Sequence, residues 1–346
     1  MVVVSLDAMG GDHAPGEIVR GAVEAVANYP VKVLLVGPEE AIRGELEKAL
    51  REAGVGPDRF KEQLEIVPAD QVIGMDEEPV MALRRKKNAS IAVATRLVRE
   101  GKAQAIVSAG STGAQMAAAV LILGRLPGVE RPAIATVLPG LKGNLVMLDS
   151  GANVDSRPKH LEQYAYMGSI YAANLLGIEN PRVALLNVGE EEAKGNELTK
   201  QTYQLLKTAK LNFTGNIEGR EVLTGGADVV VCDGFVGNVA LKLTEGIAKA
   251  LIEMIREELM SSLRTKLGAL LAKPGFKALK DRLDYSEVGG APLLGVKGIS
   301  IICHGSSRAR AIRHAVRVAM ESVDNDLIGK LRVSLPEDET AEPAEE

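Results

Sequence analysis

Short runs of β-branched and other apolar residues alternate with longer amphipathic segments along almost the whole chain. The short runs predict strands at Val2–Ser5, Val31–Val36, Leu64–Val67, Ala105–Val107, Ala133–Leu138, Leu145–Leu148, Val183–Leu186, Asp228–Val231 and Ile299–Ile302. The longer segments predict helices at Glu17–Asn28, Glu39–Glu52, Val80–Arg99, Gln115–Leu123, Lys159–Leu176, Asn196–Ala209, Val236–Met260 and Arg308–Asp324. This alternation is typical of a mostly parallel sheet with helices on both faces, and it predicts an α/β fold.

The chain has 346 residues, of which 46% are hydrophobic, so it can bury a large core and is longer than one minimal domain. We expect residues 1–330 to form one large α/β domain that either carries an insertion or divides into two lobes. The tail at 334–346 is acidic and polar, and this composition predicts disorder.

A glycine-rich turn follows the strand predicted at Ala105–Val107, with the sequence Ser108-Ala109-Gly110-Ser111-Thr112-Gly113-Ala114. The glycines let a ligand approach the backbone closely, and a helix N-terminus behind the turn favours negative charge. The turn therefore predicts a cradle for a small anion such as phosphate. It matches neither of the common phosphate-binding fingerprints, and an ordinary strand-to-helix turn with a capped helix explains it equally well.

Similar polar turns follow other strands. They are Asp7 to Pro15, which includes Gly10, Gly11 and His13; Asp149 to Asn153; Asn187 to Asn196, which includes Lys194; Asp233 to Asn238, which includes Gly237; and His304 to Arg308. Because the carboxyl ends of strands in an open α/β sheet form its ligand crevice, we expect these turns to converge on one site.

Each of these residues also has a simpler interpretation. Asn196 and Asn238 lie at predicted helix starts, where either N-capping or ligand binding would explain an asparagine. Lys194 is either a solvated loop lysine or an anion-binding group at the rim. His13 and His304 are either general bases or structural histidines.

The composition argues against several classes of protein. The net charge is -5, tryptophan is absent and aromatic residues make up 3%, so we expect no nucleic-acid partner. Cys232 and Cys303 each end an apolar run, which favours buried thiols over a nucleophile, and the histidines lack zinc-site spacing, so we expect no bound metal. The N-terminus reads as a strand and no apolar run is long enough to span a bilayer, which predicts a cytoplasmic protein.

After Asn238, leucine, isoleucine and methionine recur at helical spacing as far as Leu271, and Pro274-Gly275 is expected to break the run. This predicts a long helix and an amphipathic helical hairpin over residues 240–285. Between Arg264 and Arg282 the chain carries several cations and one acid; these residues are Arg264, Lys266, Lys273, Lys277, Lys280, Asp281 and Arg282. Such a surface suits an anionic membrane or an acidic carrier protein, while packing in a dimer core is the alternative.

Taken together, these motifs resemble the PlsX family of bacterial acyl-acyl-carrier-protein:phosphate acyltransferases. The resemblance rests on the Leu6 to Pro15 turn, the Ser108 to Ala114 turn, the Asn187 to Asn196 loop and the Cys232 to Asn238 turn, and it extends from Val2 to about Asp326. It implies a fold like that of phosphotransacetylases and isocitrate or isopropylmalate dehydrogenases.

The resemblance further implies a homodimer without cofactor that reversibly converts acyl carrier protein thioesters and inorganic phosphate into acyl phosphate for phospholipid synthesis. It implies contact of residues 260–285 with the inner membrane surface or with a membrane acyltransferase. It associates Lys194 and Asn238 with catalysis. The residues expected to bind phosphate or the acyl group are Asp7, Gly10, Gly11, Ser108, Gly110, Ser111, Thr112, Gly113, Asn153, Asn196, Asp233, Gly237 and His304.

This reaction suits the residues available, because phosphate is already anionic and needs positioning and oxyanion donors more than a nucleophile relay. We expect the Ser108 to Gly113 turn and Lys194 to hold phosphate, and Asn238 or backbone amides to polarise the thioester carbonyl. His13 or His304 could protonate the departing thiol. The alternatives are an acyl-CoA-dependent phosphotransacetylase, an NAD-dependent hydroxyacid dehydrogenase using Asp149, Asp155 and Asp233 as Mg²⁺ ligands, and a catalytically silent scaffold that binds carrier protein at the membrane.

Overall fold

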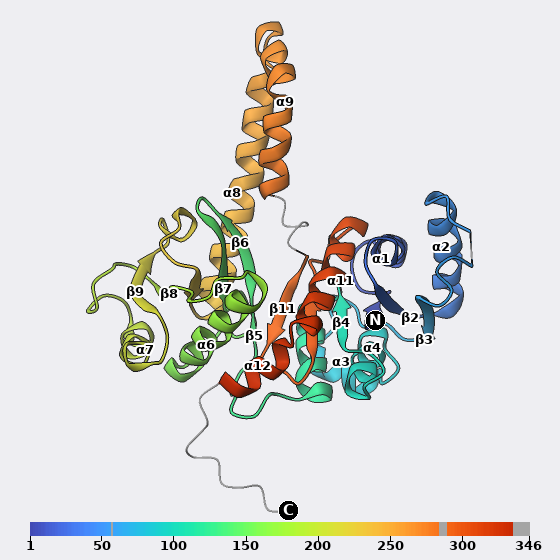
Figure 1. Cartoon of the computed structure of the whole chain (residues 1–346), viewed down its shortest axis with the longest axis horizontal. Helices are drawn as coiled ribbons and strands as arrows, with labels where there is room; N and C mark the ends of the chain where they lie inside the picture. Colours follow the sequence, from blue (N-terminus) through green and yellow to red (C-terminus); the bar gives the residue numbers. More distant parts are fainter. Residues whose placement is uncertain (57, 284–288, 335–346) are drawn as a thin grey trace, which may run out of the picture.

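The computed structural model describes residues 1–56, 58–283 and 289–334, and it contains two β-sheets that lie side by side (Figure 1). The seven-stranded sheet has the order β3-β2-β1-β4-β12-β11-β5, and the five-stranded sheet has the order β6-β7-β10-β8-β9. The strands of the first sheet are β1 (Val2–Asp7), β2 (Val31–Gly37), β3 (Leu64–Pro68), β4 (Ala105–Ser108), β5 (Ala133–Ile134), β11 (Ala291–Leu294) and β12 (Ile299–Ile302). Those of the second are β6 (Thr136–Gly140), β7 (Gly143–Leu148), β8 (Val183–Asn187), β9 (Phe213–Glu218) and β10 (Val229–Val231).

Most strand pairs are parallel. In the first sheet β1 pairs with β2 and β4, and β4 pairs with β12, all in parallel. In the second sheet β10 pairs in parallel with β7 and β8. The α/β class predicted from the sequence is confirmed, and the carboxyl ends of the parallel strands share one edge in each sheet.

The run Ala133–Leu138, predicted as one strand, is two strands that belong to different sheets. Ile134 of β5 pairs with Leu293 of β11, whereas Thr136 of β6 pairs with Met147 of β7. Ala135 lies between them, and its N–H donates to the carbonyl of Pro292 at 3.0 Å. The chain therefore pairs with β11 before Ala135 and with β7 after it, and this passage from one sheet to the other joins them.

Helices cover both faces of the first sheet. On one face α1 and α11 pack against each other, α1 against β2 and α11 against β1, with α2 beside β3; on the other face α4 covers β1, β2 and β4, and α3 and α5 pack together. These helices are α1 (Gly16–Asn28), α2 (Glu39–Glu52), α3 (Pro79–Arg85), α4 (Ser90–Arg99), α5 (Thr112–Ala118) with the π-helical η1 (Ala119–Leu123), and α11 (Ala309–Asp324).

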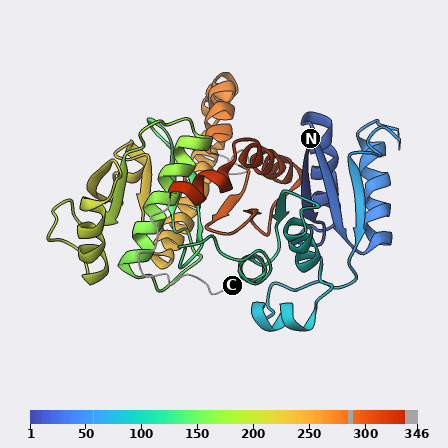
Figure 2. The same cartoon turned by 60° about the horizontal axis from the view of Figure 1, so that its bottom comes forward.

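The second sheet is covered by α6 (Pro158–Leu175) and α7 (Glu197–Thr208) on one side and by the start of α8 (Gly234–Met260) on the other. The remaining short helices are η2 (Val222–Thr224) and α12 (Leu327–Ser334). Figure 2 shows the blue N-terminal strands and the yellow-green β8 and β9 region at opposite ends of the molecule. One buried cluster includes Val4 and Leu6 of β1 together with Val146 and Leu148 of β7, so both sheets share a core.

Several predicted elements need correction. The segment Val80–Arg99 forms two helices because Lys86 leaves helical geometry, and its ammonium donates to the carbonyl of Val72 at 2.8 Å. The elements β9, β11 and α12 are not predicted from the sequence. β9 (Phe213–Glu218) is an edge strand with polar residues, and β11 (Ala291–Leu294) is short and contains Pro292, so neither has a strong strand pattern.

Helices α8 and α9 (Leu263–Leu283) form the predicted hairpin, which projects from the two sheets (Figure 1). Pro274 lies inside α9, so the predicted break is wrong: a proline removes one backbone donor, and packing against α8 keeps the helix continuous. No helix in the described residues is long and apolar enough to cross a membrane. The side chains of Lys280, Asp281 and Arg282, the hairpin residues 284–285 and the tail 335–346 lie outside the described part.

The ion pair between Arg182 and Asp228 gives a test of the second sheet. The backbone N–H, Nε and Nη2 of Arg182 donate to Asp228 at 2.8, 3.0 and 2.9 Å, and these bonds hold the pKa of Asp228 below its usual value. At neutral pH, Asp228→Asn should lower the free energy of unfolding by about 1 kcal/mol, because the arginine is partly solvated. Because the folded pKa lies below the unfolded one, the gap from wild type should close as the pH falls below 3.8. Calorimetry at neutral pH and below pH 3.8 measures this difference in unfolding free energy, with the exposed Asp58→Asn variant as the control. A difference between wild type and Asp228→Asn that stays the same at low pH would contradict the role given to the Arg182–Asp228 ion pair.

Candidate active site

Asp7 and Ser108 join two of the predicted turns beneath the surface. Ser108 Oγ donates to Asp7 Oδ2 at 2.8 Å and accepts from the N–H of Gly110 at 3.0 Å, while Asp7 Oδ1 accepts from the N–H of Met9 at 3.2 Å. Both side chains are buried, and burial raises the pKa of Asp7. A Cβ on Gly10 would lie 2.6 Å from the amide nitrogen of Gly110, so glycine is required where the turns meet. These hydrogen bonds of Asp7 and Ser108 therefore hold the turns after β1 and β4 together.

The other residues of these turns lie closer to the surface. Ser111 caps α5 by accepting from the N–H of Ala114 at 3.4 Å. A small pocket of about 140 Å³ is lined by residues that include Gly10, Gly11, Gly110 and Ser111. The N–H of Asp12 donates to the carbonyl of Gly305 at 2.8 Å, which brings the turn after β12 to the same place. The turns after β1, β4 and β12 thus form one cluster.

A second cluster is organised by Asp149 at the carboxyl end of β7. Its carboxylate accepts from the backbone N–H groups of Ile134, Gly151, Ala152 and Asn153 at 3.0, 3.2, 2.9 and 2.7 Å. Burial raises the pKa of Asp149 in spite of these bonds. The hydrogen bonds connect β5 of one sheet to the turn after β7 of the other.

Asn153, predicted to bind substrate, has structural contacts in the described residues. Its Nδ2 donates to the carbonyl of Pro132 at 2.7 Å and to Asp149 at 3.0 Å. Its carbonyl accepts from the N–H of Gly234 at 2.9 Å, which places the first turn of α8. Asn153 therefore transmits the position of Asp149 to the helix.

The start of α8 corrects one prediction. Asp233 caps the helix by accepting from the N–H groups of Phe235 and Val236, both at 3.0 Å, so Asn238 lies inside the helix and is not its cap. A Cβ on Gly151 would lie 3.3 Å from Cβ of Asn238, so the turn after β7 packs against this asparagine. By contrast, Asn196 is the cap of α7 and accepts from the N–H of Thr199 at 2.9 Å.

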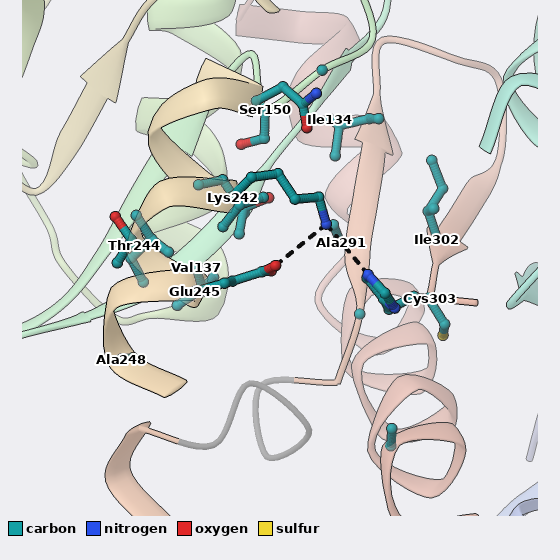
Figure 3. A pocket seen from close by; sticks show the side chains of 18 of the residues that line it. Ile134, Val137, Ser150, Lys242, Thr244, Glu245, Ala248, Ala291, Ile302 and Cys303 are labelled. Atoms are coloured by element: carbon teal, nitrogen blue, oxygen red, sulfur yellow. Dashed lines mark hydrogen bonds and ion pairs between the residues drawn. The ribbon is translucent and has the colours of Figure 1, made fainter. Parts of the chain in front are cut away.

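A cavity of about 570 Å³ lies between the two clusters (Figure 3). Its polar lining includes Thr112 and His304 from the first cluster and Ser150 and Asn238 from the second. Gly113 lies beside α3 instead, where a Cβ would be 2.8 Å from Pro79. The structure thus brings Thr112, Asn238 and His304 together, while Asp7, Ser108, Asn153 and Asp233 support the surrounding turns.

Lys242 and Glu245 also line this cavity, although neither is among the residues predicted from the sequence. Lys242 Nζ lies 3.3 Å from Glu245 Oε2 (Figure 3). It also lies 3.3 Å from His304 Nε2, and His304 Nδ1 lies 2.8 Å from Ser306 Oγ. The signal was present, because residues 238, 242 and 245 share one face of a helix. It was hidden inside a segment interpreted only for its apolar periodicity.

Lys194 lies outside this cavity. It belongs to the loop after β8, and its carbonyl accepts from Nδ2 of Asn187 at 3.1 Å. Because β8, β10 and β7 are parallel neighbours, this loop leaves the same edge of the sheet as the Asp149 and Asp233 turns. Lys194 does not line the described cavity, and neither does His13, which precedes α1.

The cysteines are buried. Burial raises the pKa of Cys303 to about 12 and that of Cys232 well above its ordinary value. Cys303 lines the cavity, but a neutral thiol is a poor nucleophile near neutral pH. Among residues 1–56, 58–283 and 289–334, no three His, Cys, Asp or Glu side chains gather as a metal site would require.

The fold is that of the phosphotransacetylases. The chain aligns with a phosphotransacetylase from Streptococcus pyogenes at a TM-score of 0.63 and 15% identity, covering 95% of this chain and 94% of that one. It aligns with the EutD phosphotransacetylase from Staphylococcus aureus at a TM-score of 0.58 and 17% identity, covering 93% and 94%. At these identities the likeness concerns the fold alone.

The sequence relatives are much closer. A family model described as fatty acid synthesis protein matches residues 2–330. The phosphate acyltransferase of Heliobacterium modesticaldum is 58% identical over 333 residues, which are 96% of this chain and 97% of that protein. The phosphate acyltransferase of a Nostoc species is 52% identical over 334 residues, 96% of this chain and 95% of that protein. The chain belongs to the phosphate acyltransferase family, and the resemblance inferred from its turns is confirmed. It is an acyltransferase enzyme of fatty acid and lipid synthesis.

Gly237 tests how α8 is seated. A Cβ at this position would lie 1.9 Å from the carbonyl oxygen of Asp149, so Gly237→Ala must push α8 away from the turn. We expect the free energy of unfolding to fall by about 1–3 kcal/mol, the usual cost of overpacking. Gly246→Ala is the control, because a Cβ there meets nothing within 4 Å and should stabilise the helix by up to about 1 kcal/mol. Equal unfolding temperatures for the two variants would contradict this packing.

Proposed function

We propose that the enzyme transfers a fatty acyl group reversibly from acyl carrier protein to inorganic phosphate, releasing acyl phosphate and free carrier protein for phospholipid synthesis. One structural observation supports this proposal in addition to the family membership: a single cavity combines hydrogen-bonding groups and a cation with a long apolar wall. Thr112, Asn238 and Lys242 supply the polar part, and Val137 and Leu241 belong to the apolar part. Phosphate and a fatty acyl thioester require this combination.

In the proposed reaction, a phosphate oxygen attacks the thioester carbonyl carbon directly. The carbon–oxygen bond to phosphate forms, a tetrahedral oxyanion develops, and the carbon–sulfur bond then breaks with its electron pair leaving on the thiolate. Lys242 and the hydroxyl of Thr112 would position the phosphate, and the amide of Asn238 would donate to the oxyanion. The raised pKa of Cys303 favours direct attack over an acyl-cysteine intermediate.

Two further residues have proposed roles. His304, which contacts both Lys242 and Ser306, would protonate the departing thiolate. Lys194, at the position that the family resemblance associates with catalysis, would contribute a second cation from the loop after β8. This loop contains Gly189 and Gly195, which permit more than one backbone path at the rim.

The α8–α9 hairpin suggests how the enzyme assembles. Its exposed apolar side chains include Leu251, Ile255, Leu263, Leu267 and Leu270. We propose that a second copy covers part of this surface in a homodimer, and that the rest meets the inner membrane surface or a membrane acyltransferase. The cations Arg264, Lys266 and Lys273 on α9 suit an anionic surface.

One assay separates the candidate functions. The full-length protein is mixed with palmitoyl-acyl carrier protein or palmitoyl-CoA, with and without inorganic phosphate, and acyl phosphate is trapped with hydroxylamine. We expect phosphate-dependent product from the carrier protein thioester. Product from the CoA thioester alone would favour the phosphotransacetylase alternative. An absence of product from both donors would contradict the proposal.

Lys242→Met and Asn238→Ala test the polar end of the cavity. Each should lower kcat/KM for acyl phosphate formation by roughly a hundredfold, because a charge-assisted contact or an oxyanion donor is lost. Lys194→Met should also lower turnover. Lys200→Met, on the exposed face of α7, removes the same charge elsewhere and should keep wild-type rates. A wild-type rate in any of the first three variants would remove that residue from the mechanism.

Flotation with anionic vesicles tests the hairpin. The double variant Leu267→Glu/Leu270→Glu should lose vesicle binding, because it places two negative charges where apolar side chains would enter the membrane surface. The control Gln201→Glu/Thr208→Glu adds the same charge on α7 and should float with the vesicles as wild type does. Equal flotation of both variants would end the membrane proposal. Sedimentation velocity of the same proteins reports whether the dimer persists.

A further inference from the structure

We propose that the groove between α8 and β6 holds the acyl chain, and that Ala248 near its far end sets the length of chain accepted. The inference rests on the proposed acyl transfer and adds the location and direction of the chain. It comes from the shape and chemistry of the cavity between the sheets, which extends well beyond the space that phosphate needs.

The wall formed by α8 is one continuous stripe. Its cavity-lining residues are Asn238, Leu241, Lys242, Thr244, Glu245, Ala248, Lys249 and Ile252. Apart from Thr244 at its margin, these positions recur at intervals of three and four residues and therefore share one helix face. With a rise of about 1.5 Å per residue, the stripe from Asn238 to Ile252 is about 21 Å long. A long-chain acyl group in its extended form has a comparable length.

The wall opposite this stripe is apolar. It is formed by Val137, Leu138 and Pro139 of β6 and by Leu223 of η2. Leu223 and Leu241 both pack against the buried cluster that contains Leu138, so the two walls meet in one hydrophobic layer. Methylene groups lying between these walls would leave water without exposing a buried polar group.

The polar groups fix the direction of the chain. Thr112, Ser150 and Asn238 lie at the end where the turns converge, and this is where the thioester carbonyl reacts. Lys242 on α8 contacts His304, which follows β12, so this polar bridge spans a cavity that is also lined by Ala291 of β11 and Ala311 of α11. Because the wall formed by β6 and η2 is apolar, the chain would lie on the β6 side, with its methyl end toward Ala248 and Ile252.

The far end opens onto apolar surface. Ile252 lines the cavity and is 41% exposed, and beyond it α8 carries the exposed residue Ile255. The methyl end of a chain longer than the groove would reach this surface instead of water. Ala248 lies just before the opening and offers only a methyl group, so it leaves room that a larger side chain would fill.

The contribution of chain burial can be expressed in rates. Each methylene removed from water is worth about a fourfold gain in kcat/KM, which is the usual transfer free energy of a buried CH₂ group converted to a ratio. Blocking the last few methylene sites should therefore reduce discrimination in favour of long chains by about tenfold or more. Chains that end before Ala248 should be affected much less.

Ala248→Phe tests the inference, with Ala250→Phe as the matched control. Ala250 is exposed on the same helix and does not line the cavity, so its variant adds the same side chain outside the groove. The assay measures kcat/KM with octanoyl-, lauroyl- and palmitoyl-acyl carrier protein. We expect the palmitoyl-to-octanoyl ratio to fall by about tenfold or more in Ala248→Phe and to stay at the wild-type value in Ala250→Phe.

The outcomes separate this inference from the proposed function. If wild type forms acyl phosphate and Ala248→Phe keeps the wild-type ratio, the groove does not hold the chain. If wild type forms no acyl phosphate from any thioester, the proposed function itself fails. Should Ala248→Phe unfold at a lower temperature than Ala250→Phe, Ala248→Leu replaces it and should show a smaller shift in the same direction. A shift toward longer chains would also overturn the inference.

Discussion

The hydrogen bonds accepted by the buried Asp149 carboxylate are the constraint on which the site depends. A carboxylate removed from water must find donors, and here most of them are backbone N–H groups: Ile134 in β5 and Gly151 to Asn153 in the turn after β7. Because β5 and β7 belong to different sheets, this one side chain sets how the sheets meet. Through Asn153 and Gly237 it also seats α8, and with α8 the side chains of Asn238 and Lys242.

Asp7 is the corresponding buried acid of the other sheet. It ends β1, is buried, and ties the turns after β1 and β4 together through Ser108. Asp7 is buried at the base of the small pocket between these turns, its carboxylate accepts hydrogen bonds from Ser108 and from the N–H of Met9, and burial raises its pKa. In both clusters the buried acids support the scaffold, and the polar groups that line the cavity include neutral donors, His304, the Lys242–Glu245 pair and Lys249.

The sequence predicted much of this arrangement, since period and turn chemistry are local properties. Most strands, most helices and the convergence of Thr112, Asn238 and His304 followed from them. Three features required tertiary contacts. The partner change at Ala135 divides one apolar run between two sheets, Lys242 and Glu245 reach the cavity only because α8 lies across β7, and Lys194 belongs to a loop whose path periodicity does not specify. Asn238 was predicted to lie at a helix start, but α8 begins earlier, at Gly234, and Asp233 caps it.

Helix α8 runs without interruption from Gly234 at the heart of the molecule to Met260 at the tip of the hairpin. Its first turns are held at Gly237 against the carbonyl of Asp149, and its last turns carry the exposed apolar residues Leu251 and Ile255. A single unbroken helix therefore presents both Asn238 and Lys242 to the cavity and the apolar side chains of the hairpin to its surroundings.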